Sequence, residues 1–301
     1  LDLVRSDWRR YTLTLDDEAS NDDDNTDFTV GVVGLQQNEG NYDLPPGVVL
    51  EQLNNNNNII RQNEQSLQLE VCDLEPEDSR GVFKNINIDM RQYNKLRMFS
   101  HADEGESNTL VSDGDLVGFI RMGNDFTQNY YQIEVPLQIS SGMSSAESIW
   151  PEVNEINIDL DILEQIKSIG IANGSLADLE PNFYNVIGGE VTETLEFDPP
   201  IIGQQRVAII GNPNFGDVRV LMVGVKNSGQ SGMDTCGEIW FNELRLSDLD
   251  NEGGWAAVAG LDANFADFAN VSATGRISTI GFGSVEQRPN ERSREDVEQY
   301  D

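Results

Sequence analysis

The chain has 301 residues, of which 38% are hydrophobic, so it is long enough for one large or two medium domains with a sizeable core. Nineteen Lys and Arg against 53 Asp and Glu give a formal net charge of −34. So acidic a chain is unsuited to nucleic acid, because a nucleic-acid-binding surface must neutralise phosphates, and it is unsuited to anionic lipid head groups for the same reason.

The first part of the sequence predicts a strand, an acidic loop and a polar linker. Residues 2–15 indicate an entering strand with two adjacent arginines, Arg9 and Arg10, and 16–27 form the acidic loop. Three aspartates of this loop offer oxygen ligands to Ca²⁺. The loop lacks the glycine and the bidentate glutamate of a calcium-binding loop, so a solvated run of charge is favoured. The Asn-rich stretch 51–65 is expected to be an irregular linker.

From Ser66 onward the sequence consists of short stretches in which apolar and polar residues alternate, the pattern of half-buried strands. Turns rich in Gly, Asn and Asp separate these stretches, and one helix of two or three turns is predicted at 160–170. The expected strands are 66–74, 94–102, 114–123, 129–139, 219–227 and 237–246. Many short strands with such turns predict an all-β, antiparallel sandwich, for which a jelly roll is our specific expectation.

Residues 255–278 keep a period of two over two arms of about ten residues, joined by a tight corner. One face of the arms is apolar: Ala257, Ala259, Leu261, Ala263 and Phe265, then Ala269, Val271, Ala273 and Ile277. Trp255 lies near one end of the arms, and Phe265 and Phe268 lie near the other.

These arms have the length and the pattern of tilted transmembrane strands. Side chains then alternate between acyl chains and water, while backbone groups pair between strands. Aromatic residues at both ends suit the two membrane interfaces. A half-buried hairpin on a water-soluble sheet has the same pattern, so both interpretations stay open on this segment alone. No stretch of 18 apolar residues predicts a transmembrane helix.

Catalytic chemistry has little support in the sequence. His101 is the one histidine, so a Ser-His-Asp or Cys-His set would have to use it, and no motif surrounds it. The stretch 154–161 is similar to the E-x-D-x-E strand of jelly-roll glucanases, but it departs from it at Asn157 and Asp161. No phosphate-binding loop and no zinc-ligand spacing occur. We expect no enzymatic activity, no metal and no cofactor.

Two further sets of residues allow alternatives. Cys72 and Cys236 form either one disulfide, as in exported proteins, or two separate buried thiols. Trp150, Trp240 and Tyr130 are either sugar-stacking faces or ordinary core residues. In the first case the chain would be an extracellular carbohydrate- or protein-binding module on the cell surface.

Three blocks of the sequence resemble one known family. They are residues 1–11 (LDLVRSDWRRY), 114–137 (GDLVGFIRMGNDFTQNYYQIEVPL) and 236–296, which begins CGEIWFNELRL and runs through the alternating arms. These blocks are similar to the SprA/Sov family, the outer-membrane translocon of the type IX secretion system of Bacteroidota. The resemblance implies a very large single-chain β-barrel that passes folded cargo proteins across the outer membrane and supports gliding motility.

The resemblance sets the expected organisation. This chain would be an internal piece: 1–27 a barrel-associated strand and acidic loop, 28–250 the sandwich insertion, and 251–301 a barrel hairpin and following loop. It implies no catalytic residue, and it implies partners among outer-membrane and periplasmic secretion subunits, cargo proteins and the lipid bilayer. Arg9 and Arg10 would pair with acids at the rim or in the lumen. Trp255, Phe265 and Phe268 would anchor the hairpin at the interfaces, with Ala257, Leu261, Val271 and Ile277 facing lipid or a partner.

Overall fold

The computed structural model describes residues 8–11, 15, 25–36, 38, 41–49, 52–55, 58–61, 63–105, 111–140, 145–195, 198, 201–249, 253–284, 287, 292–293 and 295–301. The acidic stretch 16–24, with two of the three candidate calcium ligands, lies outside these residues. The chain divides into two compact units, one of Leu1–Met90 with Lys95–Ser247 and one of Arg91–Asn94 with Asp248–Asp301.

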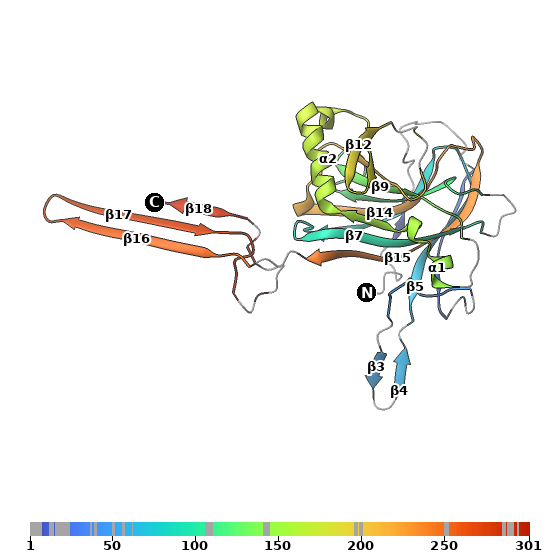
Figure 1. Ribbon diagram of the computed structural model, residues 1–301, viewed down its shortest axis with the longest axis horizontal. Coiled ribbons are helices and arrows are strands. Elements are labelled where there is room, and N and C mark those ends of the chain that lie inside the picture. The colour runs from blue at the N-terminus through green and yellow to red at the C-terminus, as the bar shows by residue number, and fades with distance from the viewer. Residues whose placement is uncertain are drawn as a thin grey trace. The chain divides into compact units, whose positions relative to one another are not determined.

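The first unit is an antiparallel, jelly-roll-like β-sandwich, as predicted (Figure 1). Its larger sheet has eight strands in the order β1 (Arg9–Arg10), β6 (Ser79–Ile88), β14 (Val218–Asn227), β8 (Leu116–Gly123), β9 (Tyr130–Pro136), β13 (Gln205–Ile210), β11 (Asn182–Ile187) and β12 (Glu190–Thr194). Its smaller sheet has five, in the order β10 (Ile156–Asp159), β7 (Tyr93–Asp103), β15 (Thr235–Leu249), β5 (Gln65–Leu74) and β2 (Asp27–Gly34). A separate two-stranded ribbon joins β3 (Gln52–Asn55) and β4 (Asn58–Arg61).

The core lies between the two sheets, because each strand turns alternate side chains inward. Leu67 and Phe241 of the smaller sheet line one apolar pocket together with Val223 of the larger sheet. A Cβ at Gly118 would lie 3.4 Å from the ring of Phe241, so the sheets pack closely at this point. The strand β14 is buried along nearly its whole length, and it lies between β6 and β8 in the larger sheet.

One helix contacts β10 of the smaller sheet and β13 of the larger sheet. The predicted helix is present as α2 (Leu160–Asn173), and it ends at Gly174, whose φ of 82° is in the left-handed region. Its buried residues are Leu160, Ile162, Leu163, Ile166 and Gly170. Tyr131 of β9 stacks on Phe215, in the 3₁₀ turn Phe215–Asp217, with ring centroids 4.9 Å apart. Two further 3₁₀ turns (Glu152–Asn154 and Ser175–Ala177) and the short helix α1 (Ala146–Ile149) complete this unit.

The glucanase-like stretch 154–161 is divided between two elements. The strand β10 ends at Asp159, and Asp161 lies in the first turn of α2, so Asn157 and Asp161 do not belong to one strand as the resemblance requires. Arg9 and Arg10 pair with Phe83 and Val82 in the eight-stranded sheet. These residues therefore form an edge strand of the larger sheet.

The second unit is a three-stranded antiparallel sheet in the order β16 (Ala256–Phe265), β17 (Ala269–Ser278) and β18 (Val297–Tyr300). The two long arms are each ten residues, or about 33 Å at the rise of an extended strand. Among the described residues, no helix is both long enough and apolar enough to cross a membrane.

Candidate functional site

The register of β16 and β17 gives the tail sheet two faces of different chemistry. Leu261 lies opposite Ala273, and Ala263 lies opposite Val271, so the apolar residues of both arms share one face. Across the two arms that face consists of Ala257, Ala259, Leu261, Ala263, Phe265, Ala269, Val271, Ala273, Gly275 and Ile277. Polar side chains predominate on the other face, including Asp262 opposite Ser272 and Asn264 opposite Asn270.

Most side chains on both faces are exposed, although Ser278 on the polar face is buried. Leu261 is 62% exposed and Val271 is 47% exposed on the apolar face, although such side chains normally lose most of their contact with water on folding. The apolar face, which we call the apolar wall, therefore leaves a contiguous hydrophobic surface open. A surface of this kind marks a contact with a partner or a membrane.

Aromatic residues lie at both ends of the arms. Phe265 and Phe268 flank the corner, where the Phe268 amide donates to the Phe265 carbonyl at 3.0 Å, and Phe268 is 93% exposed. Trp255 lies at the other end, where its amide donates to the Thr279 hydroxyl at 2.9 Å. The structure therefore places in one amphipathic hairpin the seven tail residues for which the sequence predicted a role at the membrane interfaces or against lipid.

The third strand covers only part of β17. It pairs Val297–Tyr300 with Gly275–Ser278, and the Thr274 and Asp301 backbones exchange two hydrogen bonds of 2.8 and 2.9 Å. The Tyr300 ring lies over Gly275, 3.6 Å from the position of an added Cβ, and so adds an aromatic ring to the apolar wall. Among the described strands, Ala269–Ala273 have a partner only in β16, and β16 has a partner only in β17.

Arg9 and Arg10 lie elsewhere, in the first unit. Both are exposed, and the Arg10 guanidinium carbon is 5.5 Å from the centre of the Phe28 ring. A rim or lumen role for these arginines stays a prediction.

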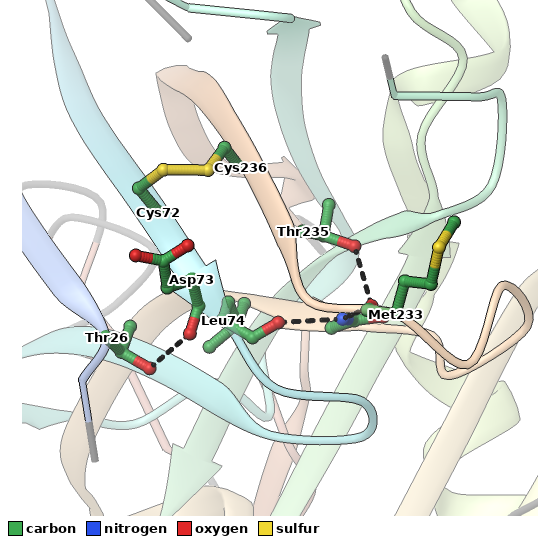
Figure 2. The surroundings of a disulfide bond; sticks show 8 residues. Thr26, Cys72, Asp73, Leu74, Met233, Thr235 and Cys236 are labelled. Atoms are coloured by element: carbon green, nitrogen blue, oxygen red, sulfur yellow. Dashed lines mark hydrogen bonds between the residues drawn. A yellow bond between two sulfur atoms is a disulfide. The ribbon is translucent and has the colours of Figure 1, made fainter. Parts of the chain in front are cut away.

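The two cysteines form a disulfide between neighbouring strands of the smaller sheet (Figure 2). Cys72 is near the end of β5 and Cys236 is the second residue of β15, at a bulge where the register shifts between Thr235 and Gly237. The Asp73 carbonyl next to Cys72 accepts from the Thr26 hydroxyl at 3.1 Å. Cys236 is buried, and Cys72 is half-buried.

Two of the three candidate sugar-stacking aromatics lie in a second core on the outer face of the smaller sheet. Trp150 and Trp240 are buried there with Tyr42 and Phe99. The Trp150 indole donates to the Asp43 carbonyl at 2.9 Å, which holds the 41–48 segment on this face. Tyr130 is also buried, with the Arg121 guanidinium 4.2 Å from its ring centre. These aromatics are core residues and present no open stacking face.

His101 lies in the same second core and has a serine and an aspartate beside it. Nδ1 is 2.6 Å from the Ile149 carbonyl, and Nε2 is 3.1 Å from the Asp103 carboxylate. A carbonyl oxygen can only accept, so Nδ1 donates to it. The Ser140 hydroxyl lies 2.9 Å from this same nitrogen and therefore faces no base. Because the ring is fully buried and stacks on Trp240 at 4.0 Å, the cluster is structural.

The residues of the glucanase-like stretch are engaged in ion pairs. The Arg97 Nε donates to the Glu155 carboxylate at 2.7 Å, and Lys95 lies 3.6 Å from Asp159. Their carboxylates therefore balance neighbouring cations on the outer face of the smaller sheet.

A row of buried charges crosses the outer face of the eight-stranded sheet and was not identified from the sequence. The Arg206 guanidinium donates twice to Glu134, at 2.8 and 2.6 Å, and the Gln132 amide donates to the other carboxylate oxygen at 2.7 Å. Arg121 extends the row by donating to Gln132 at 2.7 Å. Burial opposes ionisation of Glu134, but Arg206 and Lys226 outweigh it and hold the pKa of the Glu134 carboxyl below its ordinary value.

The fold and the tail sheet together define the class of protein: an acidic antiparallel β-sandwich joined in one chain to an exposed amphipathic β-sheet. The family model SprA_N, described as motility related/secretion protein, matches residues 1–301. The chain therefore belongs to this motility and secretion family.

Other comparisons are more distant. No curated protein matches the sequence. The family 11 carbohydrate-binding module of the cellulosomal cellulase Lic26A-Cel5E of Clostridium thermocellum has a TM-score of 0.37 and 7% identity, over 80% of this chain and 87% of that one. A likeness this distant says nothing about what the chain binds.

Proposed function

We propose that this chain is part of the protein-conducting channel of the type IX secretion system in the outer membrane. In this role the machine passes folded cargo across the membrane and supports gliding motility, and the chain itself is not an enzyme. The observation that carries the proposal is the tail sheet, with one wholly apolar face over two ten-residue arms and edges that no other described strand occupies. Membership in a motility and secretion family supports the same role.

The physical argument is that lipid accepts only strands whose backbone groups are paired and whose outward side chains are apolar. Arms of about 33 Å, tilted by about 35–45° as barrel strands are, span about 23–27 Å, which matches the apolar band of about 25 Å in outer-membrane barrels. The polar face, with Asp262 and Arg276, would then line the water-filled lumen. Glu298 lies on the same face as Tyr300, opposite Ile277 in the ladder. This position is near the Trp255 end of the arms, where lipid head groups would solvate the carboxylate.

The sandwich would be a water-facing insertion in this wall. Trp8 and Leu244 line one apolar pocket, so the chain enters and leaves the sandwich at the same end. An insertion between neighbouring strands of a wall requires this arrangement. The net charge of −34 on the whole chain favours a solvated body that stays away from anionic head groups. Its expected partners are other outer-membrane and periplasmic secretion subunits and the cargo.

The test uses bilayers whose acyl chains carry bromine, which quenches tryptophan fluorescence on contact. The full-length protein is reconstituted with and without bromine, and the signal of Trp255 is taken as the difference between the native protein and Trp255→Phe. We expect this difference signal to fall strongly in brominated lipid. Trp240, which is buried in the sandwich, supplies the control through Trp240→Phe, and its difference signal should not change. An unquenched Trp255 would contradict the proposal.

A further inference from the structure

The disulfide divides the chain into an enclosed part and two outer parts. Cys72 and Cys236 are 164 positions apart, and the residues between them form most of the sandwich. Seven of the eight strands of the larger sheet lie inside this interval, all except β1. The strands β7 and β10 and the helix α2 lie inside it as well.

The outer parts meet at the disulfide in the smaller sheet. Strands β2 and β5 pair over eight residues, from Asp27 with Cys72 to Gly34 with Gln65, and β5 pairs in turn with β15. The bond therefore joins the end of β5 to the start of β15, which are already neighbours. The chain that arrives through β2 and β5 can continue into β15 through sulfur alone, without passing through any residue of the interval.

We propose that the Cys72–Cys236 disulfide is a mechanical bypass that keeps the seven enclosed strands of the larger sheet out of the path of a pulling force. A force applied to residues before β5 and after β15 runs through β5, the two sulfur atoms and β15. Covalent closure makes it impossible for that force to extend the enclosed residues while the bond is intact. The inference depends on the position of the bond in the chain and is independent of the channel proposal.

The bond also makes the bypass sensitive to reductant. A dithiol attacks one sulfur, forms a mixed disulfide and then closes to its own cyclic disulfide, which leaves Cys72 and Cys236 as two thiols. Cys72 is half-buried and Cys236 is buried, so attack on the Cys72 sulfur is the more open route. After reduction the same pulling force can extend the whole interval.

Single-molecule pulling on the full chain, with handles at its two ends, tests the bypass. Once unfolded under force, the reduced chain should be longer than the oxidised chain by about 540–590 Å, since 164 residues extend by 3.3–3.6 Å each. A free-thiol assay on the same sample verifies the redox state. The double variant Cys72→Ser/Cys236→Ser should show the long extension with or without dithiothreitol.

The outcomes are distinct. Equal extension of the oxidised and reduced native chains, with thiol content confirming reduction, would overturn the proposal. If the double variant does not fold, the native chain with and without dithiothreitol still decides the matter. Loss of the channel function would leave the extension difference unchanged, so the two proposals fail separately.

Discussion

Leu261 and Ala273 face each other across the β16–β17 ladder, on the side of the sheet where the residues from Ala257 to Phe265 and from Ala269 to Ile277 are apolar or glycine. The next pair along, Asp262 with Ser272, lies on the opposite face. One step along the strand therefore changes the surroundings of a side chain from the apolar wall to the polar face. This difference allows matched substitutions at neighbouring positions.

Leu261→Arg should block stable insertion of the tail sheet. Leu261 is the sixth residue of the ten in β16, and an arginine facing lipid at mid-membrane costs about 2–4 kcal/mol. Ser272→Arg is the matched control, since it places the same side chain on the polar face opposite Asp262. The amount of protein in the outer membrane and the secretion of cargo should fall for Leu261→Arg and stay near native for Ser272→Arg. Equal losses for both variants would argue against lipid contact.

Glu134→Gln should destabilise the sandwich by about 3–5 kcal/mol, because it removes the buried carboxylate that pairs with the Arg206 charge. Denaturant unfolding of the full chain measures the loss. Asp217→Asn removes the partner of Arg219 at an exposed ion pair and should change the free energy of unfolding little. A small effect of Glu134→Gln would mean that the row of buried charges is not structural.

The Glu134 carboxylate also determines the direction in which stability changes with pH. The pKa of Glu134 is held below its ordinary value of 4.5, so its contribution to stability is fully present above that pH. It is lost as the pH falls through the lowered value. The native chain should therefore lose more stability on acidification than the Glu134→Gln variant does. Curves of unfolding free energy against pH that run parallel for the two proteins would contradict this.

Glu238→Gln should change stability in the opposite direction to Glu134→Gln, and stabilise the chain at neutral pH. Burial raises the pKa of Glu238, and the negative charges of Asp103 and Glu70 raise it further. Hydrogen bonds from Trp240 and Gln68 lower it, but the net shift is upward. Both donors reach the same carboxylate oxygen, at 2.5 Å each, and a glutamine would keep this acceptor. At neutral pH the variant should be more stable than the native chain by up to about 1 kcal/mol, since solvent screens a partly exposed group.

A raised pKa contributes stability below the ordinary value of 4.5 and loses it as the pH rises through the raised value. The advantage of Glu238→Gln should therefore disappear on acidification. Unfolding curves at several pH values test this. A variant less stable than the native chain at neutral pH would be the contrary result.

Gly224→Ala should destabilise the larger sheet by about 1–3 kcal/mol. An added Cβ at Gly224 would clash with the Arg80 carbonyl oxygen and the Phe119 ring, and the carbonyl cannot move without disturbing the β6–β14 ladder. Gly260→Ala in β16 is the control, because nothing lies within 4 Å of its added Cβ. Thermal unfolding should separate the two variants.

Local alternation was enough to predict much of the fold. The tail arms could be read residue by residue, because a period of two and a tight corner fix both the faces and the register. The inward faces of β5 and β9 followed from the same rule. Strand β6 was missed, since Ser79–Ile88 has few apolar residues and becomes a strand through pairing with β14 and β1.

Long-range pairing could not be predicted from the sequence. Glu134 meets Arg206 72 residues further along the chain, and Cys72 meets Cys236 at a separation of 164. Gln132 and Glu134 do alternate with the apolar residues Tyr131 and Ile133, which indicated a polar outer face. Nothing in the sequence indicated that this face would be buried. The same limit applied to Trp150 and Trp240, whose burial depends on the 41–48 segment.

The most direct measurement compares the reactivity of Leu261→Cys and Ser272→Cys with a water-soluble maleimide in intact outer membranes. The native cysteines are joined in the disulfide and give no background. The account predicts that the cysteine at 272 reacts and the cysteine at 261 does not until detergent dissolves the membrane. Equal reaction of both cysteines before detergent would contradict the claim that the apolar wall faces lipid.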